Sequence, residues 1–239
     1  MNYKCTMKSK SIISAVIPSY NRAHVVGRAV ESVIGQSFYV DEILVIDDAS
    51  EDDTALVVGE LMKKDERIRY HKIENNVGGA RARNVGISIS NGDVVAFLDS
   101  DDEWMPFHIE ASLDILETHD ADACFSRFFL DWGGCRNKGR FNHFTPGQDV
   151  ASYILSGSGG DVRTSTLVIK RNVLEAVNYD EELQKHQDWD LAIRLGRHGC
   201  VGATNSYTVV LHVESLDRMS ANINLGATQI FLSKHIHYV

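Results

Sequence analysis

The sequence predicts an α/β fold with a mainly parallel central sheet flanked by helices. In the first half of the chain, short apolar runs alternate with segments whose apolar residues recur at helical spacing. Continuous apolar runs of this kind are typical of parallel strands that helices cover on both faces. The length of 239 residues and the hydrophobic share of 44% suit a globular protein with a sizeable core.

The expected elements follow a regular order in this first half. Strands are expected at 12–17, 42–47, 68–73 and 94–98, and helices at 25–34, 53–64, 79–90 and from Pro106 onward. Because strands and helices alternate, the connections should be right-handed crossovers between parallel strands. The carboxyl ends of such strands share one edge of the sheet, where ligands bind in open α/β folds.

The second half of the chain has a less regular pattern. Strands are expected at 122–129, 165–170 and 200–213, helices at 188–198 and 221–239, and a long loop at 131–147. The sequence contains no internal repeat and no low-complexity linker. We therefore expect a single domain, residues 1–239, in which the second half forms a smaller mixed region.

Composition argues against several classes of function. The net charge of −9 and the sequence pI near 5.5 disfavour a general nucleic-acid-binding surface. The cysteines form no CxxC pair, so zinc-finger and thioredoxin sites have no support, and reduced thiols in the cytoplasm are expected. The first apolar run ends in the turn Pro18 to Asn21, which indicates a strand and not a signal peptide. No stretch approaches the roughly 18 apolar residues of a membrane span.

The most unusual cluster is acidic and follows the apolar run at 94–98. Asp99, Asp101, Asp102 and Glu103 place four carboxylates within five residues, where like charges repel. One interpretation is a solvated turn in which Asp102 or Glu103 caps the next helix. That interpretation does not require Asp99 and Asp101, which can converge on one hard cation such as Mg²⁺ or Mn²⁺.

A second acidic pair, Asp47 and Asp48, lies at the end of the expected strand 42–47. The pair could belong to a turn or a cap, or supply the ribose-binding acid of a dinucleotide fold. The dinucleotide interpretation needs GxGxxG after the first strand, and the first glycine here is Gly27. A nicotinamide dehydrogenase is therefore disfavoured, although an acid at this edge can still accept a hydrogen bond from a base or a ribose hydroxyl.

Three further groups each have a structural and a functional interpretation. Arg81 and Arg83 lie in the first turns of a helix, where they are either solvated or one of them meets an anion such as a diphosphate. Asp188 and Asp190 begin another helix, where capping explains one of them and the other could act as a base. His212 follows an apolar strand, and a lone histidine is most often a satisfied core or surface residue.

Taken together and in this order, these segments resemble the family 2 glycosyltransferases, which have a GT-A fold. The resemblance extends over about 12–220 and rests on AVIPSYN (15–21), EILVIDDASEDDT (42–54), GGARARNVG (78–86), AFLDSDDEWMP (96–106), QDWDLAIRL (187–195) and LHVES (211–215). These are similar to the family's nucleotide-binding turn, uridine-binding acid, Arg-Asn helix, metal-binding signature, catalytic-base helix and late histidine motif. The resemblance implies a nucleotide-binding half at about 12–105, an acceptor-binding half at about 106–220 and a C-terminal helix at 221–239.

The resemblance also implies roles for particular side chains. Asp188 would be the general base, and a Mn²⁺ or Mg²⁺ ion would be held by Asp101, His212 and Asp99. The nucleotide sugar would contact Pro18, Tyr20, Asn21, Asp48, Arg83, Asp99, Ser100 and Asp101, with Asp48 accepting a hydrogen bond from N3–H of uracil. The side of the sugar and the acceptor would be formed by Thr164, Ser165 and Trp189.

The implied reaction is an inverting, metal-dependent transfer of a sugar from a UDP-sugar to a hydroxyl of a glycan or lipid-linked acceptor. Its implied setting is bacterial surface-polysaccharide biosynthesis, where a lipid-linked acceptor would bring a cytoplasmic protein to the inner face of the membrane as a peripheral partner. The family often has Glu-Asp before the tryptophan, whereas Gln187 precedes Asp188 here, so the base is kept. The absence of a Gln-x-x-Arg-Trp motif argues against a processive synthase.

Two other functions remain open from the sequence. One is a sugar nucleotidyltransferase, which shares this kind of sheet but needs a glycine-rich basic loop after the first strand. The turn PSYNRAH (18–24) fits that requirement poorly. The other is a non-catalytic module that binds sugar nucleotides, against which the presence of Asp188 and His212 argues.

Overall fold

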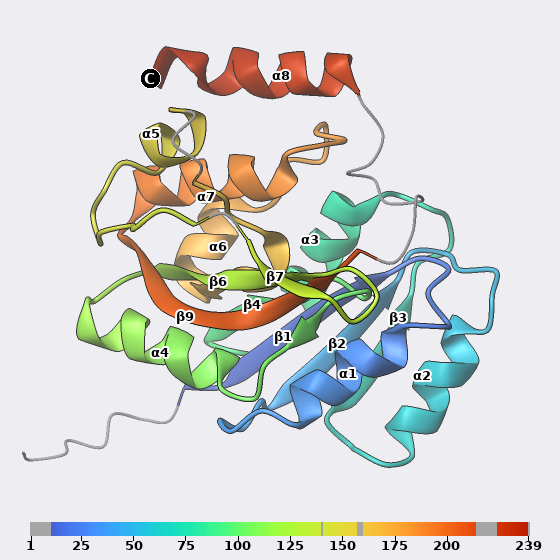
Figure 1. The fold of residues 1–239 in the computed structure, drawn as a ribbon. Helices are drawn as coiled ribbons and strands as arrows, with labels where there is room; N and C mark the ends of the chain where they lie inside the picture. The colour runs from blue at the N-terminus through green and yellow to red at the C-terminus, as the bar shows by residue number, and fades with distance from the viewer. Residues whose placement is uncertain (1–10, 140, 157–159, 214–223, 239) are drawn as a thin grey trace, which may run out of the picture.

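The computed structural model describes residues 11–139, 141–156, 160–213 and 224–238. These residues form an α/β fold in which one continuous sheet has helices on both faces (Figure 1). The strands lie in the order β3-β2-β1-β4-β8-β6-β9-β5, and β7 pairs with β6. The arrangement confirms the predicted α/β class, with a parallel part and a mixed part in the same sheet.

The parallel part comes from the first half of the chain. Its strands are β1 (Ile13–Ser19), β2 (Glu42–Asp47), β3 (Ile68–Lys72) and β4 (Val94–Phe97). The connecting helices are α1 (Val26–Ile34), α2 (Thr54–Met62) and α3 (Gly79–Ile89). Each boundary lies within two residues of the one predicted from the sequence. Apolar periodicity is strong in this half, which explains the agreement.

The mixed part comes from the second half. Its strands are β5 (Glu103–Trp104), β6 (Ala123–Asp131), β7 (Arg136–Lys138), β8 (Val168–Lys170) and β9 (Val201–His212). Strand β8 runs antiparallel to β4 and β6, whereas β9 runs parallel to β6. The helical segments are α4 (His108–Thr118), α5 (Val150–Leu155), η1 (Thr164–Thr166), α6 (Arg171–Val177), α7 (Gln187–His198), α8 (Leu225–His235) and η2 (Ile236–Tyr238).

Two elements predicted for the second half, and the helix predicted from Pro106 onward, differ from the structure. The strand expected at 165–170 begins as the 3₁₀ turn η1, because Leu167 N–H donates to the Thr164 carbonyl at 3.0 Å. The loop expected at 131–147 contains β7, which a turn with positive φ at Gly133 and Gly134 folds back onto β6. Helix α4 begins at His108 and not at Pro106. The Pro106 carbonyl accepts from the Ser37 N–H at 2.6 Å. The predicted C-terminal helix is α8, although residues 221–223 and 239 of that prediction lie outside the described residues.

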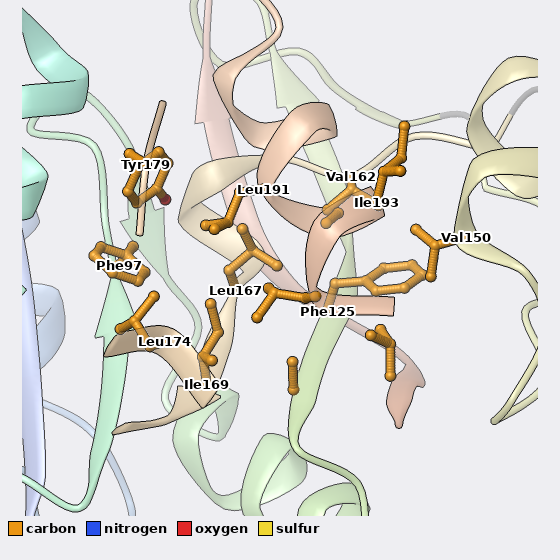
Figure 2. Packing of buried hydrophobic residues seen from close by; sticks show 14 of the residues in the cluster. Phe97, Phe125, Val150, Val162, Leu167, Ile169, Leu174, Tyr179, Leu191 and Ile193 are labelled. Atoms are coloured by element: carbon orange, nitrogen blue, oxygen red, sulfur yellow. The ribbon is translucent and has the colours of Figure 1, made fainter. Parts of the chain in front are cut away.

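Alternation along the strands divides the core into two clusters. Val16, Leu44 and Phe97 belong to the cluster under α3, α5, α6 and α7, whereas Ala15 and Val45 belong to the cluster under α1, α2 and α4. Figure 2 shows the first cluster, in which side chains of β4, β6 and β8 meet those of α6 and α7. This packing fixes α7 above the sheet, with its first turn near the carboxyl ends of the parallel strands.

Candidate active site

A pocket of about 650 Å³ lies where β1, β2 and β4 end and where α7 begins. Its walls bring together segments that are far apart in the sequence. The lining residues that the sequence predicted are Pro18, Tyr20, Asp48, Arg83, Asp99, Ser100, Asp101, Thr164, Asp188 and Trp189. The topology explains this convergence, because parallel strands expose their carboxyl ends along one edge.

The two aspartates at the end of β2 have different surroundings. Asp47 is fully buried and does not line the pocket, and one of its carboxylate oxygens accepts from the Tyr70 hydroxyl. Asp48 lines the pocket, and its two oxygens accept from the backbone N–H groups of Val77 and Gly78 at 2.7 and 2.8 Å. Each oxygen keeps a second lone pair. Asp48 can therefore accept a further hydrogen bond from a ligand.

The acidic turn after β4 divides its charges among separate partners. The Ser165 hydroxyl accepts from the Asp99 N–H at 3.1 Å and donates to the buried carboxylate of Asp102 at 2.6 Å. Glu103 lies in β5, with its Oε2 3.2 Å from Nε2 of His212. The prediction that Asp102 or Glu103 caps the next helix is therefore wrong. Both carboxylates have partners elsewhere, and α4 begins without a side-chain cap.

Asp99 and Asp101 both line the pocket, so hard oxygen ligands are present where the sequence predicts a divalent cation. Carboxylate oxygens are the ligands that Mg²⁺ and Mn²⁺ prefer, and the side chain of Asp99 is 33% exposed with, among the described residues, only its Oδ1 paired, to Arg83. The predicted third ligand, His212, does not line the pocket. Within the described parts of the chain, no three His, Cys, Asp or Glu side chains are grouped closely enough to hold a metal ion. The role of His212 as a ligand thus stays a prediction.

Asp188 lines the same pocket from the first turn of α7. Desolvation by the surrounding protein raises its pKa from the ordinary value of 3.8 to about 6. The Arg163 guanidinium opposes this rise in pKa, whereas the carboxylates of Asp161 and Asp99 add to it. The Trp189 N–H donates to Asp188 Oδ1 at 3.0 Å. A carboxylate with a pKa near 6 is ionised at neutral pH and is still basic enough to accept a proton.

Sequence reasoning missed two residues beside Asp188. Arg163 lines the pocket, and its Nε and Nη2 donate to Asp161 Oδ2 at 3.0 and 2.8 Å. The other oxygen of Asp161 accepts from Trp189 Nε1 at 3.0 Å. One carboxylate therefore holds both a cation and an indole ring in the wall of the pocket. The stretch around Arg163 matches no motif, so only the fold reveals this arrangement.

Three predicted site residues do not line the pocket: Asn21, Ser165 and His212. Asn21 has a positive φ of 52°, and its side-chain oxygen accepts from the Glu51 N–H at 2.9 Å. This contact joins the turn after β1 to the turn after β2. Ser165 and His212 contact the acidic turn from outside the pocket. The direct roles of these three residues in binding therefore stay predictions. Their observed contacts are with the turns that line the pocket.

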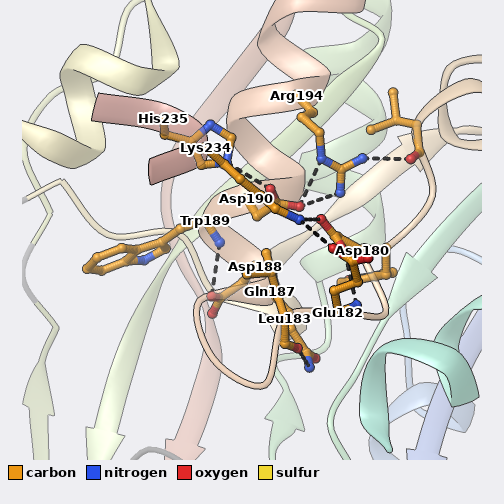
Figure 3. A network of polar contacts seen from close by, with 12 residues as sticks. Asp180, Glu182, Leu183, Gln187, Asp188, Trp189, Asp190, Arg194, Lys234 and His235 are labelled. Atoms are coloured by element: carbon orange, nitrogen blue, oxygen red, sulfur yellow. Dashed lines mark hydrogen bonds and ion pairs between the residues drawn. The ribbon is translucent and has the colours of Figure 1, made fainter. Parts of the chain in front are cut away.

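Asp190 follows in the same turn of α7 but faces other groups (Figure 3). It is buried, and its Oδ2 accepts from Nε of Arg194 at 2.9 Å and also from Nη2. Its Oδ1 lies 2.8 Å from Nε2 of His235, which belongs to α8. The neighbouring Lys234 pairs with Asp180 in the segment that leads into α7. Helix α8 is thus attached to α7 by polar contacts as well as by aromatic packing.

The fold and the pocket define a class of protein. The mixed sheet with an acidic turn at the end of β4 is that of the GT-A glycosyltransferases. Crystal structures of S. aureus TarS have this fold. The complex of TarS residues 1–349 with UDP-GlcNAc superposes with a TM-score of 0.76 over 93% of this chain and 66% of that one, at 17% sequence identity.

The family model described as Glycosyl transferase family 2 matches residues 14–175, and the chain belongs to this family. The amylovoran biosynthesis glycosyltransferase AmsB of Erwinia amylovora is 31% identical over 196 residues, which cover 78% of this chain and 64% of AmsB. The UDP-Glc:alpha-D-GlcNAc-diphosphoundecaprenol beta-1,3-glucosyltransferase WfaP of Escherichia coli is 33% identical over 120 residues, 50% of this chain and 47% of WfaP. The matches thus span about half to two thirds of these relatives. Of the helices described, none combines the length and apolarity needed to cross a membrane.

Proposed function

We propose that the protein transfers a sugar from a UDP-sugar to a hydroxyl group of a glycan or lipid-linked acceptor, with inversion at the anomeric carbon. The observation that carries this proposal is the composition of the pocket. It joins Asp48, Asp99 and Asp101 at the strand ends to Asp188, whose pKa is raised to about 6. One wall thus offers carboxylates that can accept hydrogen bonds from a nucleoside and bind a divalent cation, and the other offers a base. Membership of family 2 supports the same class of reaction.

In this proposal the half of the chain at about 12–105 binds the nucleotide. Asp48 accepts a hydrogen bond from N3–H of uracil, since it lines the pocket and each of its oxygens keeps a lone pair beside the one that accepts from a backbone N–H. Tyr20, 44% exposed at the rim, and Pro18 offer apolar surface to the base. Asp99 and Ser100 lie at the end of β4, on the side expected for the ribose and the diphosphate.

The predicted cation would be held by Asp101 and Asp99, together with His212 in the predicted ligand set. When bound, a Mn²⁺ or Mg²⁺ ion supplies electrostatic stabilisation for the negative charge that the diphosphate gains as it leaves. Asp102 is less accessible to an ion than Asp99, because the residue is only 5% exposed and its Oδ2 accepts from Ser165. Asp99 and Asp101 are therefore the carboxylates of this turn that we assign to the ion.

The half at about 106–220 supplies the acceptor side. Asp188 takes the proton from the acceptor hydroxyl as the hydroxyl oxygen attacks the anomeric carbon. Attack from the face opposite the diphosphate inverts that carbon in a single displacement. A diphosphate leaves without a general acid, so a second catalytic carboxylate is not needed. Trp189 and Thr164 line this side of the pocket, and Trp189 is held in place by Asp161.

The relatives suggest which substrates to test first. The name of WfaP states a UDP-glucose donor and a diphosphoundecaprenol-linked acceptor, the name of AmsB states amylovoran biosynthesis, and a TarS structure contains UDP-GlcNAc. By analogy, we propose a UDP-sugar donor, a lipid-linked saccharide acceptor and a role in bacterial surface-polysaccharide assembly.

The test has two parts. Calorimetry with UDP should show binding that strengthens when Mn²⁺ is added and weakens in Asp101→Ala. Binding that is indifferent to both changes would contradict the metal-dependent part of the proposal. Hydrolysis of a panel of UDP-, dTDP- and GDP-sugars then identifies the donor. Pyrophosphate release from a nucleoside triphosphate and a sugar phosphate would favour a nucleotidyltransferase, and UDP binding without any turnover would favour a non-catalytic module.

A further inference from the structure

Helix α3 contains Arg83, for which the family resemblance predicts contact with the nucleotide, and its neighbour Asn84. The guanidinium of Arg83 is instead occupied inside the protein, and the residue is only 6% exposed. Its Nη2 donates to Asp99 Oδ1 at 2.6 Å, and its Nη1 donates to Gln187 Oε1 at 2.9 Å. Asp99 belongs to the acidic turn, whereas Gln187 is the residue just before Asp188. One side chain therefore joins the donor side of the pocket to the start of α7.

The neighbouring Asn84 contacts the same part of the chain. Its Nδ2 donates to the Tyr179 carbonyl at 2.9 Å, and its Oδ1 accepts from the Tyr179 N–H at 2.9 Å. The Arg83 guanidinium lies over the Tyr179 ring, 5.3 Å from its centroid. Helix α3 thus holds the segment 179–187 at both ends, through Asn84 at its start and Arg83 at its end.

The turn hydrogen bonds within the segment 179–187 lie in its first part, where Asp180 accepts from the N–H groups of Glu182 and Leu183 at 3.0 and 3.3 Å. The segment has no regular secondary structure before Gln187, and His186, at the start of α7, has a positive φ of 60° and makes no side-chain cap. Both polar atoms of the Gln187 side chain have partners. Its Oε1 accepts from Arg83, and its Nε2 donates to the Leu183 carbonyl at 2.6 Å (Figure 3). A small displacement of Gln187 would move the carboxylate of Asp188.

We propose that Arg83 is a positioning residue, which sets the place of Asp188 through Gln187 and does not itself bind the nucleotide. This inference rests on the proposed function, because it assigns Asp188 as the base. Each terminal nitrogen of Arg83 already uses one of its two N–H groups on a protein atom, and its Nε is buried without a partner among the described residues. The guanidinium bridges Asp99 and Gln187 with two different nitrogens and so fixes the distance between two walls of the pocket. Lys has a single side-chain nitrogen and reproduces this bridge poorly.

The test compares Arg83→Lys with Gln187→Leu, and Arg81→Gln serves as the control. Arg81 lies on the same helix, is largely exposed, and has its nearest carboxylate, Glu181, 3.9 Å away. For each variant, kcat and KM are measured with the UDP-sugar found by the donor screen, and UDP affinity is measured by calorimetry. We expect Arg83→Lys and Gln187→Leu each to lower kcat roughly 10- to 100-fold, with UDP affinity within about two-fold of the unaltered protein. Arg81→Gln should leave both quantities unchanged.

The double variant gives the sharper result. If Arg83 acts through Gln187, Arg83→Lys combined with Gln187→Leu should be no worse in kcat than the more affected single variant. The inference would be overturned if the fold-losses in kcat of the two single variants multiplied in the double variant. It would also be overturned if Arg83→Lys lost UDP affinity but kept kcat, which would indicate that Arg83 binds the nucleotide. Thermal unfolding shows whether each variant is folded. If Arg83→Lys does not fold, Gln187→Leu still tests the inference, because an unchanged kcat in that variant would overturn it. Failure of the proposed function looks different, because the unaltered protein would then neither bind UDP nor turn over any donor.

Discussion

Two carboxylates in the first turn of α7 have opposite surroundings. Asp188 lines the pocket, where desolvation raises its pKa to about 6 and the nearby Arg163 only partly offsets that rise. Asp190 is buried on the side of α8, where it accepts from Arg194 and contacts His235. Both residues are aspartates in the first turn of the helix. The difference between them lies in whether the protein supplies cations that bind directly to the carboxylate.

The comparison explains how one helix turn serves both chemistry and stability. Removal of one partner of a buried ion pair destabilises the fold, because it leaves the other charge without its partner. A desolvated carboxylate whose nearest cation is bound to another residue keeps its basicity. Arg163 donates to Asp161, so Asp188 feels its charge without forming an ion pair with it. The variants below test this division, beginning with the largest expected effect.

Asp188→Asn should abolish most of the activity. Without the base, kcat is expected to fall about 10³-fold, while UDP affinity measured by calorimetry stays the same. Folding raises the pKa of Asp188 from its ordinary value of 3.8 to about 6, so the folded protein loses stability as the pH rises through this range and the group ionises. The variant should therefore be as stable as the unaltered protein at pH 7, or more stable by on the order of 1 kcal/mol. Full activity in Asp188→Asn would refute its role.

Asp190→Asn should act mainly on stability. The change removes the anion that two basic side chains share and leaves Arg194, 24% exposed, without its charged partner. We expect the free energy of unfolding in urea to fall by about 3 kcal/mol. UDP affinity of the remaining folded protein should persist. If this variant were fully stable but inactive, the assignments of Asp188 and Asp190 would have to be exchanged.

The pH dependence of activity should reveal the charge of Arg163. Because Asp188 must be ionised to accept a proton, kcat/KM should rise with pH through an acidic limb near 6. Arg163 lowers the pKa of Asp188, so Arg163→Gln should move this limb upward by roughly one pH unit. Arg163→Lys keeps the positive charge and serves as the matched control. An acidic limb at the same pH in all three proteins would show that Arg163 does not influence the base.

The sequence predicted the parallel half of the fold closely, because each strand there is a continuous apolar run followed by a helical pattern. It also located the pocket, since polar clusters at Asp48, Asp99 and Asp101 follow strands whose ends share an edge. It could not distinguish Asp188 from Asp190 by local pattern, and only the family resemblance favoured Asp188. The decisive partner His235 lies 45 positions further along the chain.

Long-range partners also explain the other errors in the site. Asp102 and Glu103 looked like helix caps because a helix follows them, but their partners Ser165 and His212 come from η1 and from the end of β9, which approach the turn only in the folded protein. Arg163 gave no signal because its importance comes from its position relative to Asp188. Local patterns predict which residues are polar at a strand end. They do not predict which of those residues already have a partner.

Trp189, between the two carboxylates in the sequence, should show the smallest effect. Trp189→Phe removes the hydrogen bond from Nε1 to Asp161 Oδ1 but keeps an aromatic ring against His186 and Phe231. We expect the free energy of unfolding to fall by about 1–2 kcal/mol, since the lost partner is a carboxylate. Asp161 keeps its two hydrogen bonds from Arg163, so the acidic limb of the pH profile should not move. Urea unfolding and the pH profile measured on the same variant separate these effects. A shifted limb would mean that the indole, together with Arg163, sets the basicity of Asp188. The difference between Asp188 and Asp190 would then depend on Trp189 as well.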